Sequence, residues 1–235
     1  MRELVIGDIH GCSQSFLALL EIVEPRSDDV FVLLGDYIDR GPDSRGVIEA
    51  ILDLSSRCTV VPIRGNHEIM FQRALQDSRS LPEWLKHGGH ATLDSYQKRG
   101  PRDPAVIPER HRTFLLEQTL DYWETAERIF VHATVDPEAD LAEQTELHLF
   151  WEKFRNPTVH KSGKPIICGH ASQKSGLPAA FEKGLCIDTW PAGKGWLTCY
   201  DTHERSFIQT NERGGRRTFT LRQLLGPAST QFDTF

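Results

Sequence analysis

The sequence predicts an α/β fold with a largely parallel sheet at its start. Three short apolar runs, each suited to a buried strand, lie in the first third of the chain: Leu4–Ile6, Val30–Leu34 and Thr59–Ile63. Helical patterns separate them, and each run is followed by a glycine and then by Asp or Asn. Strand and helix alternating in this order favour parallel pairing, with polar residues gathered at the carboxyl ends of the strands.

Two amphipathic helices are predicted between these strands. Residues Ser13–Val23 place apolar side chains on one broad face, as in a helix laid against a sheet. Farther along, Asp43 or Ser44 can cap a second helix, in which the apolar residues of Val47–Leu52 recur at helical spacing. A third helix is expected to begin near Glu68.

The rest of the chain divides into an insertion and a β-rich part. Between residues 77 and about 120, prolines and paired glycines separate short helical pieces, which is typical of a lid-like insertion. After Tyr122 the predicted strands are Arg128–His132, Pro165–Gly169, Leu185–Thr189, Trp196–Tyr200 and Arg205–Thr210. A hairpin turn over Asp201–Glu204 joins the last two strands, and the tail 211–235 receives no assignment.

Composition limits the class of protein. The 235 residues carry a formal net charge of −6, which argues against a general nucleic-acid binder. No apolar leader precedes the first predicted strand, and no apolar run approaches membrane-spanning length. We therefore expect a soluble cytoplasmic protein that binds neither nucleic acid nor membrane. The five cysteines are scattered and lack C-x-x-C spacing, which favours reduced thiols over a disulfide framework or a zinc site.

The polar residues that follow the strands have the ligand types of a dinuclear metal site. Asp8 and His10 alternate after the first run, so in an extended backbone their side chains leave the same face. Together with Asp36 they make a plausible first metal site. Taken singly, an aspartate after a strand more often caps the following helix, and a histidine is more often a core residue. The combined pattern favours metal ligands.

A second metal site is expected from residues far apart in the sequence. Asn66 follows the third run, and His132 and His170 end two later strands, so these three could complete it, with Asp36 bridging both ions. Two ions about 3.5–4 Å apart lower the pKa of a bridging water and stabilise its attack on phosphorus. Oxygen and nitrogen ligands without cysteine fit manganese, iron and zinc alike. The expected cofactors are two divalent ions, manganese first, with iron or zinc as alternatives.

Charged and titratable side chains beside these ligands suit phosphoryl transfer. Arg40 and Arg64 can place guanidinium groups on phosphate oxygens and offset charge in the transition state. His67 can donate a proton to a departing alkoxide, a poor leaving group, and such general-acid help is worth roughly 10²–10⁴-fold. Asp39 is the candidate for orienting that imidazole and supporting its protonated form.

Three of these segments, Gly7–Gly11, Gly35–Ser44 and Arg64–Glu68, resemble the signature blocks of the phosphoprotein phosphatase family of metallophosphoesterases, in its bacterial serine/threonine phosphatase-like branch. Further segments resemble other blocks of that branch in order and spacing: Trp84–Gly89, Ala91–Leu93, Ser95-Tyr96, Val131–Ala133, Gly169-His170 and Cys186–Thr189. The resemblance spans roughly residues 3 to 210, which is nearly the whole chain.

The resemblance implies a four-layer αββα sandwich with a dinuclear metal site at the strand ends. It implies one metallophosphoesterase catalytic domain over residues 1–235, with the lid-like insertion and the unassigned tail described above. It also implies the ligand, arginine and Asp39–His67 roles given above, and it adds Arg155, which follows Phe150–Lys153. For Arg155, a phosphate contact and a surface salt bridge are equally good interpretations.

The predicted activity is metal-dependent hydrolysis of phosphomonoesters by direct attack of a metal-bridging hydroxide. Phosphoserine or phosphothreonine in a phosphoprotein or phosphopeptide is the first substrate class. The alternative is a symmetrical dinucleoside tetraphosphate hydrolase, which needs a wall for base stacking that Trp84, Tyr96 or Trp190 could supply. A non-enzymatic scaffold that binds phosphate or a partner is the weakest hypothesis, because it need not retain the ligands, the Asp–His pair and both arginines. The sequence gives no oligomeric state.

Overall fold

Two β-sheets form the centre of the structure, a computed structural model that describes residues 1–153 and 159–226. Within these residues the first sheet consists of β1 (Glu3–Ile6), β2 (Val30–Leu33), β3 (Thr59–Pro62), β9 (Leu197–Asp201), β10 (Ser206–Thr210) and β11 (Arg216–Thr220). The second consists of β4 (Tyr122–Glu124), β5 (Ile129–Val131), β6 (Ile166–Cys168), β7 (Ala179–Phe181) and β8 (Gly184–Cys186). The strand order is β11–β10–β9–β1–β2–β3 in the first sheet and β4–β5–β6–β8–β7 in the second.

Helices flank the first sheet and fill the insertion. The α-helices of the described residues are α1 (Ser13–Val23), α2 (Ser44–Ser55), α3 (Asn66–Gln76), α4 (Leu81–Trp84), α5 (His90–Tyr96), α6 (Glu109–Thr113) and α7 (Leu221–Leu225). Shorter helical turns are η1 (Ser78–Ser80), η2 (Leu85–Gly89), η3 (Pro104–Val106), η4 (Phe114–Gln118), η5 (Leu141–Glu143), η6 (Leu147–Trp151) and η7 (Pro191–Gly193). Asp43 caps α2 by accepting the Gly46 N–H at 2.9 Å, so the predicted cap is confirmed.

Each sheet has three parallel strands. β1, β2 and β3 pair in parallel, and so do β5, β6 and β8, whereas the other strands add antiparallel. The prediction of an α/β fold with parallel pairing in the first third is confirmed. Because the carboxyl ends of parallel strands meet at one edge of a sheet, the loops after these strands gather the polar residues that the sequence analysis singled out.

The predicted late strands are present with shorter or shifted bounds, and the structure adds elements that the sequence pattern did not indicate. β4 and β7 have three residues each, too few to show a period. The part of the tail that is described contains β11 and α7. β11 alternates exposed and half-buried residues, and its Phe219 stacks on Phe207 of β10 with ring centroids 5.1 Å apart.

Three clusters of apolar side chains hold these elements together. Between the sheets, Val5, Val32 and Val61 of the first pack with Phe130 and Leu185 of the second. On its other face the first sheet packs against α1 and α2, and η5 and η6 cover the outer face of the second sheet. The layers therefore run helix, sheet, sheet and short helical turns. This confirms the predicted fold class, with a thin fourth layer.

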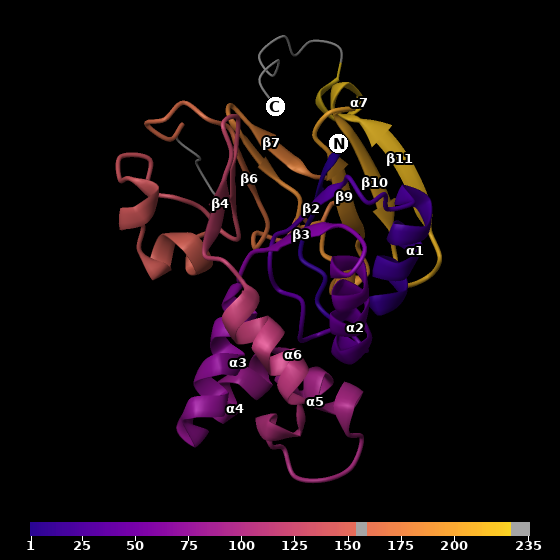
Figure 1. Cartoon of the computed structure of the whole chain (residues 1–235), viewed down its shortest axis with the longest axis vertical. Helices are drawn as coiled ribbons and strands as arrows, with labels where there is room; N and C mark the ends of the chain where they lie inside the picture. The colour runs from indigo at the N-terminus through magenta and orange to yellow at the C-terminus, as the bar shows by residue number, and fades with distance from the viewer. Residues whose placement is uncertain (154–158, 227–235) are drawn as a thin grey trace.

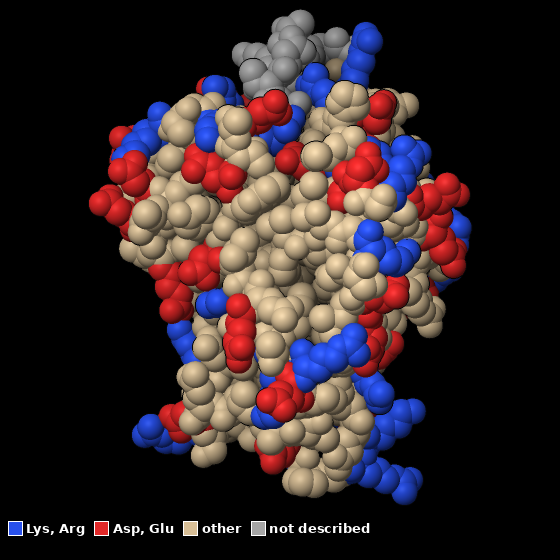
Figure 2. All heavy atoms as spheres, viewed as in Figure 1, with Lys and Arg blue, Asp and Glu red and all other residues tan. Residues whose placement is uncertain are grey.

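The insertion lies at one end of the molecule. Figure 1 shows α3 to α6 gathered at the end opposite α7 and the N-terminus. Trp84 and Phe114 anchor this segment in the apolar cluster that also holds α1 and α2. Figure 2 shows acidic and basic side chains interspersed around a hollowed and mostly uncharged centre on one face. Among residues 1–153 and 159–226, no helix combines the length and apolar character needed to cross a membrane.

Gly7 sets the separation of the two sheets at the edge where the polar loops gather. A Cβ atom at this position would lie 2.6 Å from the backbone oxygen of Ile187, which follows β8. The Gly7 N–H donates to the Thr198 carbonyl at 3.1 Å and fixes the residue in the first sheet. Only glycine lets β1 approach the second sheet this closely, and the approach places Asp8 near Asp188.

We expect Gly7→Ala to displace the loop after β1, because a backbone oxygen cannot move aside as a flexible side chain can. Overpacking of this kind lowers the free energy of unfolding by about 1–3 kcal/mol, and bound metal should be lost with it. Gly215→Ala is the control, since its backbone is not left-handed and the nearest atoms to a Cβ there belong to the Asn211 side chain, which can move aside. Denaturant titration and metal analysis test both variants; full metal content in Gly7→Ala would contradict the expectation.

Candidate functional site

Tight turns at the strand ends orient the candidate site residues. Five of these residues have the left-handed backbone that L-residues rarely adopt: His10 (φ +47°), Asp36 (φ +52°), Asp39 (φ +73°), Arg40 (φ +67°) and His170 (φ +61°). A non-glycine residue in this conformation costs about 1–3 kcal/mol and persists only where its surroundings impose it. Strain concentrated in the loops after β1, β2 and β6 therefore singles out this edge of the sheets.

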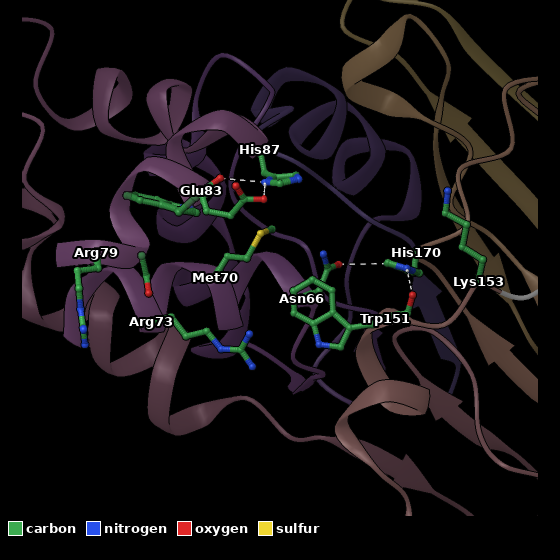
Figure 3. Close-up of a pocket in the computed structure, with 11 residues that line it drawn as sticks. Asn66, Met70, Arg73, Arg79, Glu83, His87, Trp151, Lys153 and His170 are labelled. Atoms are coloured by element: carbon green, nitrogen blue, oxygen red, sulfur yellow. Dashed lines mark hydrogen bonds and ion pairs between the residues drawn. The ribbon is translucent and has the colours of Figure 1, made fainter. Parts of the chain in front are cut away.

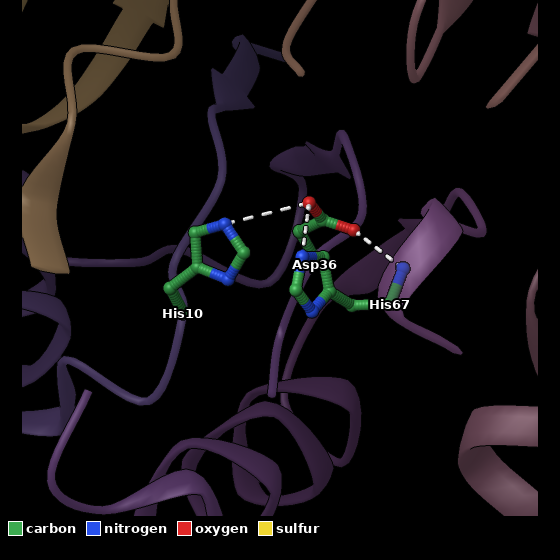
Figure 4. A group of neighbouring side chains, drawn as sticks. All are labelled: His10, Asp36 and His67. Carbon is green, nitrogen blue, oxygen red and sulfur yellow. Dashed lines mark hydrogen bonds and ion pairs between the residues drawn. The ribbon is translucent and has the colours of Figure 1, made fainter. Parts of the chain in front are cut away.

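The Asp36 carboxylate lies at the centre of the site. Its Oδ2 is 3.4 Å from Nε2 of His10 and 3.9 Å from Nε2 of His67 (Figure 4). Its Oδ1 is 3.5 Å from Nε2 of His132. Although burial opposes ionisation, the surrounding histidines, His132 foremost, hold the pKa of Asp36 far below its ordinary value. The ligand atoms form two groups that share Asp36: His10, Asp36 and His67, and Asp36, His132 and His170.

Backbone carbonyls fix how two of these rings are turned. Nδ1 of His10 lies 3.0 Å from the Ile38 carbonyl, and Nδ1 of His132 lies 2.7 Å from the Leu34 carbonyl. A carbonyl only accepts, so Nδ1 carries the proton in both rings and Nε2 presents its lone pair to Asp36. Burial lowers the pKa of His10 well below its ordinary value, which keeps that ring neutral. Neutral imidazole with its second nitrogen held by an oxygen is the form that binds metal ions.

Asn66, at the start of α3, meets His132 and His170 from the loops after β5 and β6. Oδ1 of Asn66 is 3.0 Å from Nε2 of His132 and 3.1 Å from Nδ1 of His170. Nε2 of His170 lies 3.1 Å from the Trp151 carbonyl, so it carries the proton and Nδ1 faces Asn66. Burial, reinforced by His132, lowers the pKa of His170 to about 4. These three side chains direct one oxygen and two nitrogen lone pairs to a common region.

Asp8 lies outside both ligand groups of the described residues but contacts the same loops. Both of its oxygens accept the His170 N–H, at 3.1 and 3.0 Å. Burial raises the pKa of Asp8 well above its ordinary value, and the nearby Asp188 and Asp36 carboxylates add to the rise. A divalent cation would balance this buried acid. The surplus of buried carboxylate, together with imidazole and oxygen donors, fits a dinuclear metal site.

Arg40 reaches the centre of the site. Its guanidinium nitrogens lie 2.8 Å from Nε2 of His10 and 2.8 Å from Nε2 of His67. Because a guanidinium only donates, both imidazoles accept these bonds through their lone pairs. The Arg40 N–H donates to the Gly88 carbonyl at 3.3 Å, which ties the turn to the insertion. Arg40 is therefore placed where a phosphate oxygen could replace either ring as its partner.

Arg64, also predicted to bind phosphate, makes its contacts with the end of the insertion. The Arg64 guanidinium contacts the hydroxyl and carbonyl oxygens of Thr119 and lies 3.4 Å from the Asp121 carboxylate. These contacts join the end of the insertion to β3, and a phosphate role for Arg64 stays a prediction. Arg155 lies outside the described residues.

Asp39 and His67 form a buried pair. Nδ1 of His67 is 2.6 Å from Oδ2 of Asp39, and neither side chain is exposed. The carboxylate accepts, so Nδ1 carries a proton and Nε2 faces Arg40. Burial opposes protonation of His67, but Asp36 and Asp39 outweigh it and raise the pKa of the imidazole above its ordinary value. A histidine that is readily protonated at Nε2 has the character of a general acid.

Glu68 is a site residue whose part the sequence analysis missed. Its buried carboxylate accepts the N–H groups of Asp36, Tyr37 and Gly65, at 2.9, 3.0 and 2.9 Å. It thereby joins the turn after β2 to the turn after β3. Burial, with Asp36, raises the pKa of Glu68 to about 7, although the backbone donors oppose the rise. The available signal was its place as the third residue of α3, where a glutamate reaches back to the helix start.

Two residues of the insertion contact Asp39 directly. Trp84 is fully buried, and its Nε1–H donates to Oδ2 of Asp39 at 2.9 Å. The Thr92 hydroxyl donates to Oδ1 at 2.6 Å. The hypothesis that Trp84 offers a wall for base stacking is wrong, because its indole is enclosed in the core. Both positions stand in a segment that the resemblance singled out, but a linear pattern does not show which carboxylate they contact.

A cleft of about 650 Å³ opens beside the second ligand group (Figure 3). Asn66 and His170 line it on the side of that group, and Met70, Arg73 and Trp151 form part of its walls. The Arg73 guanidinium lies 5.7 Å from the centroid of the Trp151 ring. The lining includes three further basic side chains, Arg79, His87 and Lys153. The volume is in the range of small-molecule sites, and the lining favours an anionic ligand with an apolar part.

Comparison with known proteins identifies relatives of this chain. Residues 1–189 match the calcineurin-like phosphoesterase family. The chain is 43% identical over 88 residues to serine/threonine-protein phosphatase 1 of Salmonella typhimurium, covering 36% of this chain and 38% of that protein. It is 29% identical over 144 residues to the symmetrical bis(5'-nucleosyl)-tetraphosphatase of Glaesserella parasuis, covering 60% and 48%. The chain thus spans less than half the length of these curated relatives.

A solved structure shares the fold. The cold-active protein-tyrosine phosphatase of a psychrophilic Shewanella superposes with a TM-score of 0.67 at 17% sequence identity. The superposition covers 92% of this chain and 80% of that one. At this identity the likeness shows only that the two proteins share the arrangement of the two sheets and their helices.

We expect the chain to bind two divalent ions and His132→Ala to lose one, because Nε2 of His132 is one of the lone pairs directed at Asp36 and Asn66. The loss should exceed the about 10–100-fold drop in affinity that follows removal of an outer-shell partner. His67→Asn is the matched variant: His67 also lies near Asp36, but as an acid it should leave both ions bound. Metal analysis after reloading and dialysis decides this, and the reverse pattern would exchange the two roles.

Proposed function

The chain belongs to the calcineurin-like phosphoesterase family, whose members are dinuclear metal-dependent phosphoesterases, and from this premise we propose that it hydrolyses phosphomonoesters, phosphoserine and phosphothreonine in proteins first. The proposed metal ligands are Asp8, His10, Asp36, Asn66, His132 and His170. Two divalent ions held there, manganese as the first choice, would lower the pKa of a water and neutralise charge on the phosphate.

Arg40 and His67 have complementary parts in this proposal. The Arg40 guanidinium would move from the two imidazoles to the oxygens of a bound phosphate, because its positive charge neutralises the negative charge of the phosphate there. Nε2 of His67 would then face the leaving-group oxygen. Asp39 holds the opposite nitrogen of the ring, so a second proton on this imidazole resides at Nε2. The pair is set to protonate the departing oxygen.

The buried Asp39–His67 pair is the observation that carries the substrate class. Serine and threonine leave as alkoxides, whose high basicity makes proton donation valuable, by roughly 10²–10⁴-fold. The leaving group of a phosphoanhydride is a weaker base and gains less from an acid. A carboxylate and a histidine that are fully buried and 2.6 Å apart therefore support an ester with an alkoxide leaving group as the substrate.

A dinucleoside tetraphosphate is the second candidate, and Trp151 is the observation that favours it. Its half-buried indole lies in the cleft beside Asn66 and His170, and its Nε1–H donates to Glu146 at 3.1 Å, which fixes the ring. A base could stack on this surface while the basic lining contacts the polyphosphate. Stacking of a base on an aromatic side chain is worth about 1–3 kcal/mol.

We expect His67→Asn to lower kcat most for esters with poor leaving groups. Alkyl phosphates should lose roughly 10²–10⁴-fold, whereas 2,4-dinitrophenyl phosphate, whose leaving group needs no proton, should change little. Steady-state kinetics over a series of leaving groups on the manganese-reloaded protein measures this dependence. Turnover of alkyl and activated aryl phosphates that falls by one common factor would remove the general-acid role from His67.

We expect a phosphothreonine peptide to exceed diadenosine tetraphosphate in kcat/KM on the reloaded protein. Trp151→Leu sharpens the comparison, because it removes the stacking surface and leaves the backbone carbonyl that contacts His170. If the dinucleotide is the better substrate and Trp151→Leu raises its KM by about 5–100-fold, as stacking energies imply, the second candidate replaces the first. Activity of the wild-type protein and of Trp151→Leu on p-nitrophenyl phosphate controls for the metal site.

A further inference from the structure

Donors occupy both oxygens of the Asp39 carboxylate. Oδ2 accepts the Nδ1–H of His67 at 2.6 Å and the Nε1–H of Trp84 at 2.9 Å. Oδ1 accepts the hydroxyl of Thr92 at 2.6 Å. The Thr92 oxygen in turn accepts the Asp39 N–H at 2.8 Å, so one threonine holds both the backbone and the side chain of Asp39. The carboxylate cannot rotate without breaking at least one of these bonds.

Water cannot replace these donors. Asp39, His67, Trp84 and Thr92 all have no exposed surface. A buried carboxylate oxygen without a donor raises the free energy of the folded state. The bonds from Trp84 and Thr92 therefore contribute more than the same bonds would at the surface. The Ser44 hydroxyl lies 3.1 Å from the Asp39 nitrogen and offers an alternative acceptor for the backbone, but it gives no bond to Oδ1.

The insertion backbone also comes against this turn. Gly88 has φ +119°, and a Cβ on it would lie 2.6 Å from the Arg40 nitrogen. A Cβ on Gly89 would lie 2.6 Å from the Trp84 ring. The two glycines therefore let the chain pass between the indole and the strained turn of Asp39 and Arg40. This explains the paired glycines between the tryptophan and the threonine in the segment that the sequence analysis singled out.

We propose that Trp84 and Thr92 are positioning residues for the general acid. They hold Asp39 in the orientation that accepts the Nδ1 proton of His67, and so keep Nε2 directed at the leaving group. The segment 77–120, predicted as a lid-like insertion, then also holds the Asp39–His67 pair in place. This inference rests on the proposed role of His67 and extends it to residues that touch neither substrate nor metal.

Thr92→Val tests the proposal with the smallest change, because valine keeps the shape and removes the hydroxyl. We expect kcat for alkyl phosphates to fall about tenfold to a hundredfold, at most the share that the acid itself supplies, while 2,4-dinitrophenyl phosphate stays within about threefold. Thr92→Ser restores the hydroxyl and should restore the alkyl rate. In a His67→Asn background, Thr92→Val should have no further effect, because the acid is already lost.

Matched controls separate positioning from general damage. Trp84→Phe removes the indole N–H that bonds Asp39 and should lower the alkyl rate as Thr92→Val does. Thr113→Val is the control for the threonine, in α6 of the insertion and not among the donors to Asp39 in the described residues. Trp123→Phe is the control for the tryptophan, at a ring that stacks on Phe130. Both controls should keep the wild-type leaving-group dependence. Bound metal should stay at the wild-type level in every variant.

Proton NMR supplies a readout that does not depend on turnover. The Nδ1 proton of His67, in a 2.6 Å bond to a carboxylate, should give a far-downfield resonance in the wild-type protein. Thr92→Val and Trp84→Phe should move or broaden it, and Thr92→Ser should return it. An unmoved resonance, a rate loss equal for all leaving groups, or failure of serine to rescue would each overturn the proposal. If the loss of kcat in His67→Asn is the same for all leaving groups, the proposed role of His67 as the acid is wrong. If that loss depends on the leaving group in His67→Asn but not in Thr92→Val, only the positioning role of Thr92 is wrong.

Discussion

The concentration of buried negative charge at one edge of two sheets is the constraint on which the rest of the structure depends. Asp8, Asp36 and Asp188 follow β1, β2 and β8, and all three are buried. Parallel pairing is required because only parallel strands bring successive carboxyl ends to one edge. Two facing sheets bring a second set of ends to the first, and the close approach at Gly7 lets them meet. Histidines that follow strands of both sheets then surround the carboxylates, and this unfavourable burial of negative charge leaves a group of side chains that could hold cations.

Backbone strain accompanies this concentration of charge, and neighbouring segments hold it in place. Left-handed turns at the strand ends raise the free energy of the folded chain, so contacts with neighbouring segments must disfavour other conformations of these turns. Glu68 does this for Asp36 by accepting three N–H groups from the turns after β2 and β3. Gly88 and Thr92 do it for the turn of Asp39 and Arg40. The strained turns therefore depend on contacts with segments far away in the sequence, so the geometry of the site depends on the tertiary structure as a whole.

Local signals carried most of what could be predicted, and tertiary contacts decided the rest. The strands of the first third and α1 follow from apolar periodicity, and the ligand types at strand ends predict the region where Asp36, Asn66 and His132 meet. Trp84 misled the sequence analysis because an aromatic residue in an insertion looks the same whether it faces a cleft or a buried carboxylate. β11 was not predicted because its arginines and threonines weaken the alternation of apolar and polar residues, while its pairing with β10 stabilises the strand. Arg64 lies beside a ligand motif in the sequence, but its guanidinium contacts Thr119 and Asp121 at the end of the insertion, which the sequence did not indicate.

If the proposed function holds, substrate choice and proton donation are coupled through α4. Glu83 lines the cleft, and the next residue, Trp84, donates to Asp39 from inside the core. A shift of α4 that widens the cleft would therefore move the indole away from the carboxylate that orients His67. Side-chain changes at Arg73 and Trp151, which lie on α3 and η6, alter the cleft without touching that bond. Under the proposed function, preference for one phosphate ester over another could therefore change through side chains on α3 and η6, whereas changes in α4 would alter recognition and proton donation together.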